Sequence, residues 1–236
     1  MKATRNVLWL FCVGTLLLVP TAARAHGVGL EIGSVWTHDG ESAYRAVADV
    51  GDTLPELGVG AAVTLLRREP LRLDATLAWS MTESQANVAD GISTSLLEHA
   101  FTAGARLRWA RFSWIQPYLS VRGGPAFVWY DAGDLESSDY ALRALPAAGV
   151  DLVLPFSAIA PPALAPGQPA PQPSSAGLGV GLEVGYRFQT TYRLDADRPL
   201  PEDEDVAADA IPREGAHLGE LSMSGWRFGV NLFGRF

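Results

Sequence analysis

Apolar and polar residues alternate along most of this chain with a period of two. In the stretch 71–81, for example, Leu71 and Leu73 share one parity and Arg72 and Asp74 the other. Such alternation predicts β-strands with two chemically different faces. The pattern predicts strands at 28–37, 57–66, 71–81, 96–109, 114–130, 140–156, 177–190 and 221–236. Beyond the first 25 residues no apolar run reaches the roughly 20 residues of a membrane-spanning helix, which excludes a helical membrane protein.

The connections between these segments alternate in length. Connectors 67–70 and 110–113 are short and polar. The long connectors are 38–54, 83–94, 131–139 and 191–219. Outer-membrane barrels show this asymmetry, with short turns at the periplasmic end and long loops at the outer end. We therefore expect an all-β, eight-stranded antiparallel up-and-down barrel with a short-turn end and a long-loop end.

One connector at the expected short-turn end is long. Residues 157–176 carry six prolines between Pro161 and Pro173, a composition that predicts an extended segment without regular structure. We interpret it as an inserted periplasmic linker. The alternative is a docking segment for a periplasmic partner.

The first 25 residues have the organisation of a cleavable signal peptide. A short basic start precedes an apolar stretch at 7–19, and Ala23 and Ala25 supply the small residues that signal peptidase requires. The apolar stretch is too short for a permanent helical anchor. Cleavage would leave residues 26–236 as the barrel. The single cysteine, Cys12, lies in the leader, so no disulfide can hold the mature fold.

The residue types on the polar face of the predicted strands indicate whether that face points to bulk water or into a lumen. A soluble barrel or sandwich would bury the apolar face, whereas an inverted barrel would turn it toward lipid. The polar face is rich in arginine and glycine, and Lys2 of the leader is the only lysine, which favours a crowded lumen. The lumen would then hold Glu31, Glu56, Asp74, Glu98, Asp151, Glu183, Arg72, Arg106, Arg108, Arg122, Arg143, Arg187, Arg227 and Arg235.

Aromatic residues gather near the ends of the predicted strands. Trp36, Trp79, Trp129, Tyr130, Tyr186, Phe188 and Trp226 lie toward the long loops, and Trp109, Phe112, Trp114, Phe156 and Phe236 toward the short turns. Membrane-spanning barrels carry aromatic girdles at both interfaces, whereas a soluble core would place large aromatics in the middle of its strands. The distribution therefore favours the inverted barrel.

The last segment, 225–236, resembles the closing strand of bacterial outer-membrane proteins, which the barrel-assembly machinery recognises. The matching residues are Trp226, Phe228, Val230, Leu232 and the terminal aromatic Phe236, whereas Gly234 departs from the pattern. Over residues 28–236 the chain resembles the small eight-stranded barrels of the OmpA transmembrane domain, OmpX and OmpW. The resemblance implies an outer-membrane location in a Gram-negative bacterium, contact with lipid and lipopolysaccharide, and a monomer.

Charge narrows the range of partners. The net charge of −8 becomes −11 when Lys2, Arg5 and Arg24 of the leader are removed, which excludes a nucleic-acid-binding surface. The acidic residues of the last long loop are Asp195, Asp197, Glu202, Asp203, Glu204, Asp205, Asp209 and Glu214. Such a loop suits divalent cations that bridge to lipopolysaccharide. Its spacing is not that of an ordered Ca²⁺ loop, which favours a solvated, mobile segment.

Catalytic chemistry finds little support in the sequence. Ser95, His99 and Glu98 are the nearest candidates for a lipid A-modifying site, but no motif of those enzymes is present. The start His26-Gly27 is similar to that of secreted copper monooxygenases, for which His38, His99 or His217 would have to supply a second ligand. We expect no enzymatic activity, no cofactor and no metal site.

The expected function is that of a non-catalytic outer-membrane barrel with a structural or surface-interaction role. Eight strands leave an interior that side chains fill, so the lumen charges should pair into a plug. The alternative is a narrow pore or a carrier for small molecules of the OmpW kind. An apolar pocket in the lumen would favour the carrier.

Overall fold

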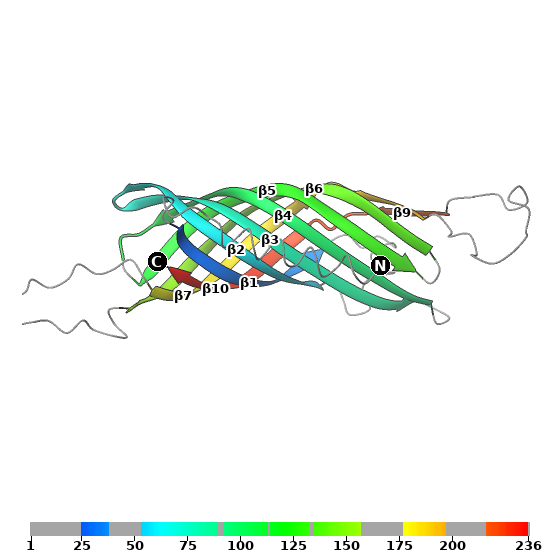
Figure 1. Cartoon of the computed structure of the whole chain (residues 1–236), viewed down its shortest axis with the longest axis horizontal. Helices are drawn as coiled ribbons and strands as arrows, with labels where there is room; N and C mark the ends of the chain where they lie inside the picture. Colours follow the sequence, from blue (N-terminus) through cyan, green and yellow to red (C-terminus); the bar gives the residue numbers. More distant parts are fainter. Residues whose placement is uncertain are drawn as a thin grey trace, which may run out of the picture.

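The chain folds into one closed barrel with a small additional ribbon. A computed structural model describes residues 25–37, 53–88, 92–112, 114–132, 135–156, 177–196 and 216–235. The barrel strands are β1 (Ala25–Thr37), β2 (Thr53–Arg68), β3 (Leu71–Val88), β4 (Ile92–Trp109), β5 (Ile115–Ala132), β6 (Leu135–Pro155), β7 (Gly177–Gln189) and β10 (Gly225–Arg235). The eight-stranded antiparallel up-and-down barrel expected from the sequence is confirmed (Figure 1).

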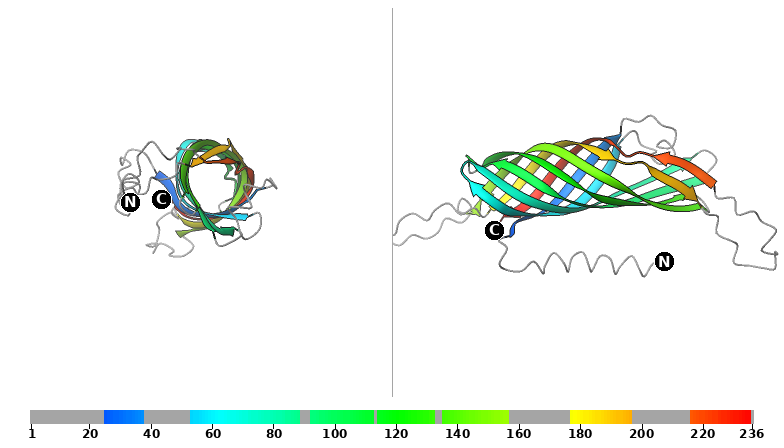
Figure 2. Two further views of the ribbon diagram at one scale, coloured as in Figure 1. Left: turned by 90° about the vertical axis from the view of Figure 1, so that its right-hand side faces the viewer. Right: turned by 90° about the horizontal axis from the view of Figure 1, so that it is seen from above.

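Pairing of the first and last barrel strands closes the sheet. β1 runs antiparallel to β10, with Leu30 opposite Leu232 and Trp36 opposite Trp226. The view along the barrel in Figure 2 shows a complete ring of strands. Closure gives each strand two hydrogen-bonded neighbours, so the sheet has no open edge. Among the described residues, no helix is long and apolar enough to cross a bilayer.

Five strands extend further toward the long-loop end than the sequence predicted, since β2 begins at Thr53 and β3 to β6 are also longer. The β3–β4 ladder continues from Thr82 opposite Glu98 to Val88 opposite Ile92, and β5 pairs with β6 out to Ala132 opposite Leu135. The expected long connectors 83–94 and 131–139 are therefore mostly strand. The prediction failed there because these residues no longer follow the alternation that marks a lipid-facing strand.

The expected loop 191–219 also contains regular structure. It begins and ends with β8 (Tyr192–Ala196) and β9 (Ala216–Leu221), which pair as a separate two-stranded ribbon. The last barrel strand consequently begins at Gly225 and not at the predicted residue 221. Ser224 fixes this junction, because its Oγ accepts a hydrogen bond from the Gln189 amide (3.0 Å) and donates one to the Gln189 carbonyl (3.1 Å).

The proline in the predicted strand 140–156 does not interrupt β6. Pro146 is exposed on the outer face and remains opposite Val121 of β5. Toward β7 the ladder is interrupted between Ala144 and Ala147, because proline has no amide hydrogen to donate. β6 therefore keeps one continuous neighbour through the proline.

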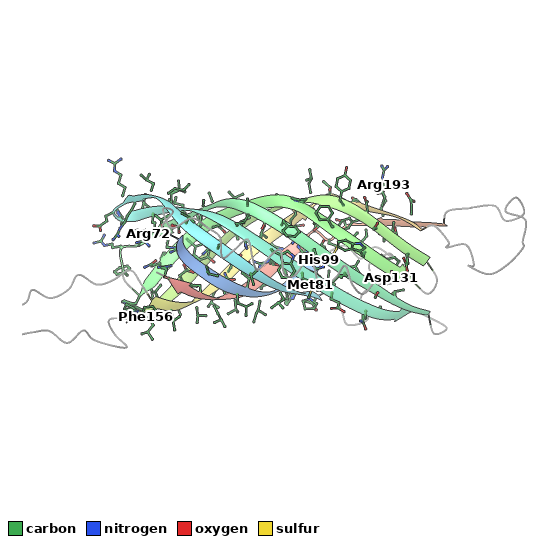
Figure 3. All side chains as sticks on the ribbon, in the orientation of Figure 1. Arg72, Met81, His99, Asp131, Phe156 and Arg193 are labelled. Atoms are coloured by element: carbon green, nitrogen blue, oxygen red, sulfur yellow. The ribbon has the colours of Figure 1, made fainter. Side chains whose placement is uncertain are left out.

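The barrel is apolar outside and charged inside. Along β10, Trp226, Phe228, Val230 and Leu232 are each more than 40% exposed, whereas the intervening Arg227 is 1% exposed. Figure 3 places Arg72 and Phe156 toward the short-turn end and Asp131 and Arg193 toward the other end. This distribution is the reverse of that in a water-soluble domain, where large apolar side chains are mostly interior.

A closed barrel of this kind should resist detergent. We expect the unheated, folded protein to migrate differently from the boiled protein on a gel containing dodecyl sulfate, because detergent has no free sheet edge from which to unzip the strands. Identical migration of the two samples after verified refolding would contradict the closed barrel.

Candidate functional site

Charged side chains fill the barrel interior in three layers, which together we call the lumen network. In the layer nearest the long-loop end, Glu56 accepts hydrogen bonds from Arg187 (2.6 Å) and from Arg227 Nε (2.8 Å). Glu98 pairs with Arg143 and with Arg187, the latter at 3.4 Å. All five side chains are buried. Each carboxylate therefore contacts at least two guanidinium groups.

The middle layer joins opposite walls of the barrel. Arg122 on β5 donates to both carboxylate oxygens of Glu31 on β1 at 2.9 Å, and β5 and β1 are four positions apart in the ring of eight. Glu183 accepts from Arg122 at 3.1 Å and from Arg227 at 2.5 Å. Tyr118 also donates its hydroxyl hydrogen to Glu183, at 3.1 Å. The two upper layers together balance four glutamates with four arginines.

The third layer, nearest the short-turn end, holds more positive charge than negative. Arg108 contacts Asp74 at 3.1 Å and Asp151 at 3.3 Å, and Arg235 contacts Asp151 at 3.1 Å. Arg72 is also buried here, and it forms no ion pair with any residue in the described part of the chain. The fourth arginine of the layer, Arg106, lies 3.9 Å from Glu183 and stacks on the ring of Tyr118 at 4.2 Å.

The structure places all the charged residues assigned to the lumen on the inner face. It also adds neutral polar partners that the sequence analysis did not single out. Gln189 donates to Glu98 at 2.8 Å, and Gln116 accepts from Arg235 at 2.7 Å. Both glutamines lie at positions of the same parity as the charged residues of their strands. This parity could have predicted that they face the lumen.

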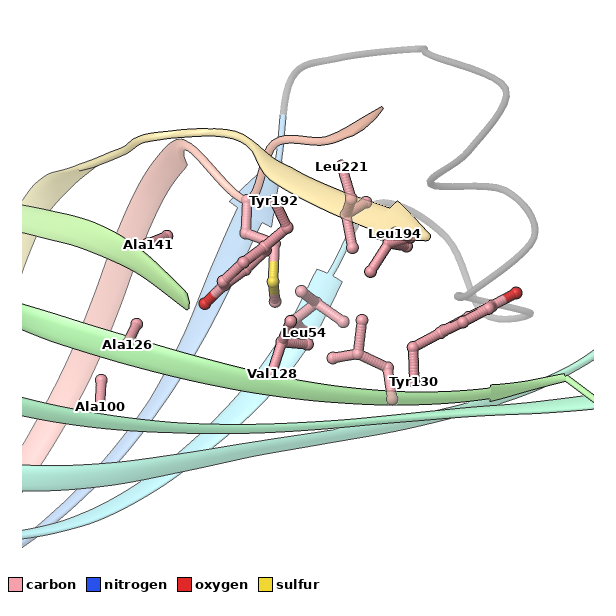
Figure 4. Packing of buried hydrophobic residues seen from close by; sticks show 11 residues of the cluster. Leu54, Ala100, Ala126, Val128, Tyr130, Ala141, Tyr192, Leu194 and Leu221 are labelled. Carbon is pink, nitrogen blue, oxygen red and sulfur yellow. The ribbon is translucent and has the colours of Figure 1, made fainter. Parts of the chain in front are cut away.

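An apolar cluster closes the lumen at the long-loop end. It consists of Leu54, Leu96, Ala100, Ala126, Val128, Tyr130, Ala141, Tyr192, Leu194, Leu221 and Met223, and we call it the lid cluster (Figure 4). The β8–β9 ribbon supplies its upper part. β8 lies along β6, because Ser137 donates to the Asp195 carbonyl at 3.0 Å and the Arg193 amide donates to Asp139 at 2.6 Å.

The lid cluster was not predicted from the sequence, and one of its members was assigned to the wrong face. Tyr130, expected in an outer girdle, is 6% exposed and lies inside the barrel mouth. The usable signal was the run of apolar residues on the inward parity, since Leu54 precedes Glu56 by two positions and Leu96 precedes Glu98 by two. Inward apolar residues at the end of a barrel strand predict a core that lies beyond the lipid.

Tyr192 connects the lid cluster to the lumen network. Its hydroxyl donates to Glu98 at 2.6 Å, and its side chain is fully buried. Burial and the neighbouring carboxylate of Glu98 raise the pKa of Tyr192 above its usual value, so the phenol remains a neutral donor. The ribbon is therefore attached to the charged interior by one specific hydrogen bond.

The girdle tryptophans lie on the outer surface. Trp36, Trp109, Trp114, Trp129 and Trp226 are each more than 40% exposed. Trp79 is partly covered, because His99 stacks on it with ring centroids 5.6 Å apart. Of the assembly-signal residues, Phe228, Val230 and Leu232 face outward, and Phe236 lies outside the described residues.

The candidate catalytic groups are not brought together. Glu98 points into the lumen, whereas Ser95 lies on the opposite parity of β4 and donates to Asp131 at 3.2 Å on the outer surface. His99 shares the outer parity with Ser95 and contacts Trp79 and Trp129. His38 lies outside the described residues, as do the side chains of His26 and His217. Within the described ranges, no group of three acidic, histidine or cysteine side chains could hold a metal.

Removing one carboxylate from the network should be costly. We expect Glu98→Gln to lower the free energy of unfolding by about 3–5 kcal/mol, because Arg143 and Arg187 lose a buried counter-charge. Denaturant titration of the barrel in lipid vesicles measures this change. The matched variant Glu136→Gln, at an exposed position on β6, should stay within about 0.5 kcal/mol of the unaltered protein. Equal effects of the two variants would contradict the network.

Comparison with known proteins gives only distant similarities. No family model and no curated protein matches the sequence. The chain is similar in structure to Ail, the attachment invasion locus protein of Yersinia pestis, in its complex with the heparin analogue sucrose octasulfate. The two share 10% sequence identity with a TM-score of 0.44, and the similarity covers 89% of this chain and 98% of that chain. The chain is also similar to Neisserial surface protein A, with 14% identity and a TM-score of 0.41. This similarity covers 89% of this chain and 96% of that chain.

The assignment of the fold rests on the chain's own strand pairing and not on these likenesses. Eight strands close in sequence order, apolar side chains cover the outside and paired charges fill the inside. The chain is therefore a small, closed, eight-stranded β-barrel of the outer-membrane type.

Proposed function

We propose that this protein spans the outer membrane as a sealed, monomeric barrel with a structural or surface-interaction role and without catalysis. The observation that carries the proposal is the filled interior, in which the lumen network and the lid cluster follow one another along the barrel. Eight-stranded barrels have interiors that side chains can fill, so no bulk diffusion path is expected.

The outer surface supports a position in a bilayer. Leucine, valine and isoleucine side chains form its middle band, and exposed tryptophans such as Trp36 and Trp109 lie toward its two ends. Apolar residues flanked by aromatic ones match the hydrocarbon and interfacial zones of a membrane. Residues 1–24 of the proposed signal peptide, 1–25, lie outside the described residues, and Ala25 is the first residue of β1. The signal peptide remains a prediction.

The alternative of a small-molecule carrier finds less support. A carrier for apolar molecules would need open apolar space in the lumen, whereas Tyr192, Leu221 and Met223 fill the apolar part of this barrel mouth. The polar part below is occupied by paired charges. Sealing therefore fits the interior better than transport.

The long-loop end offers an acidic surface to partners. Glu83, Asp131, Glu136 and Glu220 are exposed there, and Arg193 is an exposed counter-charge. Such a surface favours lipopolysaccharide contacts through divalent cations and disfavours direct binding of polyanions. The closing strand remains the proposed signal for the barrel-assembly machinery. Segment 157–176, proposed as a periplasmic linker or docking segment, lies outside the described residues.

Membrane insertion predicts a depth-dependent cost for charge on the outer face. Leu182→Arg, in the middle of the outer band, should lower the free energy of unfolding in lipid vesicles by about 2–4 kcal/mol. The matched change Leu154→Arg, at the short-turn end of β6, should cost only about 0–1 kcal/mol because the guanidinium reaches the interface. Equal costs at the two positions would contradict a transmembrane band.

A sealed lumen predicts little ion flow. Planar-bilayer recordings of the unaltered protein should give no large, stable conductance. The double variant Leu221→Ala with Met223→Ala, which empties part of the lid cluster, should also stay closed because the lumen network lies beneath it in series. A large, stable, non-selective conductance of the unaltered protein would overturn the sealed-barrel proposal.

A further inference from the structure

A small cavity lies in the layer of the lumen nearest the short-turn end. Its volume is about 50 Å³, and one side is the inner face of β1 and β2, where Gly29, Gly60 and Ala62 present little or no side chain. A Cβ added to Gly60 would lie 3.0 Å from a carboxylate oxygen of Glu31. The small residues therefore create the space, and charged side chains from the other strands face it.

The charge around this cavity is unbalanced. The two upper layers pair four glutamates with four arginines, whereas the third layer holds Arg72, Arg106, Arg108 and Arg235 against Asp74 and Asp151. At the cavity itself, the lining arginines outnumber the lining carboxylates by one, since Arg106, Arg108, Arg122 and Arg235 face Glu31, Asp74 and Asp151. Buried arginines remain charged because their intrinsic pKa is very high, so an excess of this kind requires a counter-ion or water.

Unsatisfied polar atoms surround the same cavity. Buried atoms without a hydrogen bond to any residue in the described ranges include Nε of Arg106, Arg108 and Arg122, the Thr76 hydroxyl and the Asn231 side-chain amide. The three Nε groups and Asn231 Nδ2 are donors, the Thr76 hydroxyl can donate or accept, and Asn231 Oδ1 is an acceptor. Two carboxylate oxygens at the cavity also accept no hydrogen bond: Asp151 Oδ1, and Asp74 Oδ2, which has the Arg108 guanidinium 3.1 Å away as an ion-pair partner. Buried polar atoms are nearly always hydrogen-bonded, so a cluster of exceptions around a cavity indicates a bound species.

We infer that the cavity binds one small oxyanion, hydrogen phosphate or dihydrogen phosphate. The volume accommodates about three or four waters, and a compact oxyanion replaces such a group. Several guanidinium donors match the oxygens of a tetrahedral anion. The two carboxylate oxygens would repel sulfate, which carries no hydrogen at neutral pH, but they can accept hydrogen bonds from the P–OH group of a protonated phosphate.

The proposal concerns a site inside the barrel and is independent of what the outer end binds. Because the site lies inside the barrel, we expect phosphate to enter as the barrel closes and to exchange slowly afterwards. The chain should therefore be refolded into detergent with inorganic phosphate, passed through a phosphate-free gel-filtration column, and assayed for retained phosphate by ³¹P NMR.

The unaltered protein should retain one phosphate per barrel, and its thermal unfolding midpoint should be higher than after refolding without phosphate. An equal concentration of sulfate should raise the midpoint less than phosphate does, which separates the site from the general stabilising effect of such salts. No retained phosphate, or equal stabilisation by sulfate, would overturn the proposal.

Two variants at the cavity, Ala62→Leu and Thr76→Val, and one control variant, Ala75→Leu, test the position of the site. Ala62→Leu fills the cavity and should abolish retention, whereas Ala75→Leu, at an outward position on the neighbouring strand β3, should retain phosphate like the unaltered protein. Thr76→Val, which removes one hydroxyl donor without changing the side-chain shape, should reduce retention at least several-fold and serves if Ala62→Leu does not fold. Full retention by folded Ala62→Leu or by Thr76→Val would place the anion elsewhere and overturn the assignment.

Discussion

Most charges inside this barrel meet an opposite charge on another strand, and Arg72 is the exception within the described ranges. An unpaired member of a buried ion pair costs about 3–5 kcal/mol, and an arginine turned outward near the middle of a bilayer costs about 2–4 kcal/mol. A one-residue slip of any strand would incur both costs at once, because it exchanges the inner and outer faces. The network therefore fixes the register of the sheet as firmly as the outer apolar band does.

The polarity of the barrel changes along its axis. Within the apolar band the interior is charged, whereas at the long-loop end Leu54, Val128 and Leu221 form an interior like that of a soluble domain. The change follows from the surroundings of each part, since the extended ends of β2 to β6 no longer need an apolar outer face. The same lumen is thus closed by paired charges within the apolar band and by apolar packing at the long-loop end.

The barrel and the inward charges could be predicted from the sequence, as could the outward placement of most tryptophans, because strand alternation is a local pattern. The sequence did not reveal the extensions of β2 to β6 or the β8–β9 ribbon, whose residues follow no lipid-facing alternation. Tyr130 was misassigned for the same reason, since an aromatic side chain beyond the membrane can face either way. The excess of arginine over carboxylate was countable from the sequence, but its concentration beside Asp74 and Asp151 depends on the three-dimensional pairing.

Many ion pairs of the network join residues far apart in the chain: Arg122 with Glu31 across 91 positions, Arg187 with Glu56 across 131, and Arg227 with Glu31 across 196. None of these pairs can exist while the sheet is still an open ribbon. The arginines must therefore stay hydrated until the sheet has curled, and the bore loses its bulk water only when β1 meets β10. A single strand would carry unpaired charges into the hydrocarbon, so the strands cannot insert one at a time. Curling of the sheet, dehydration of the bore and insertion are therefore parts of one concerted event.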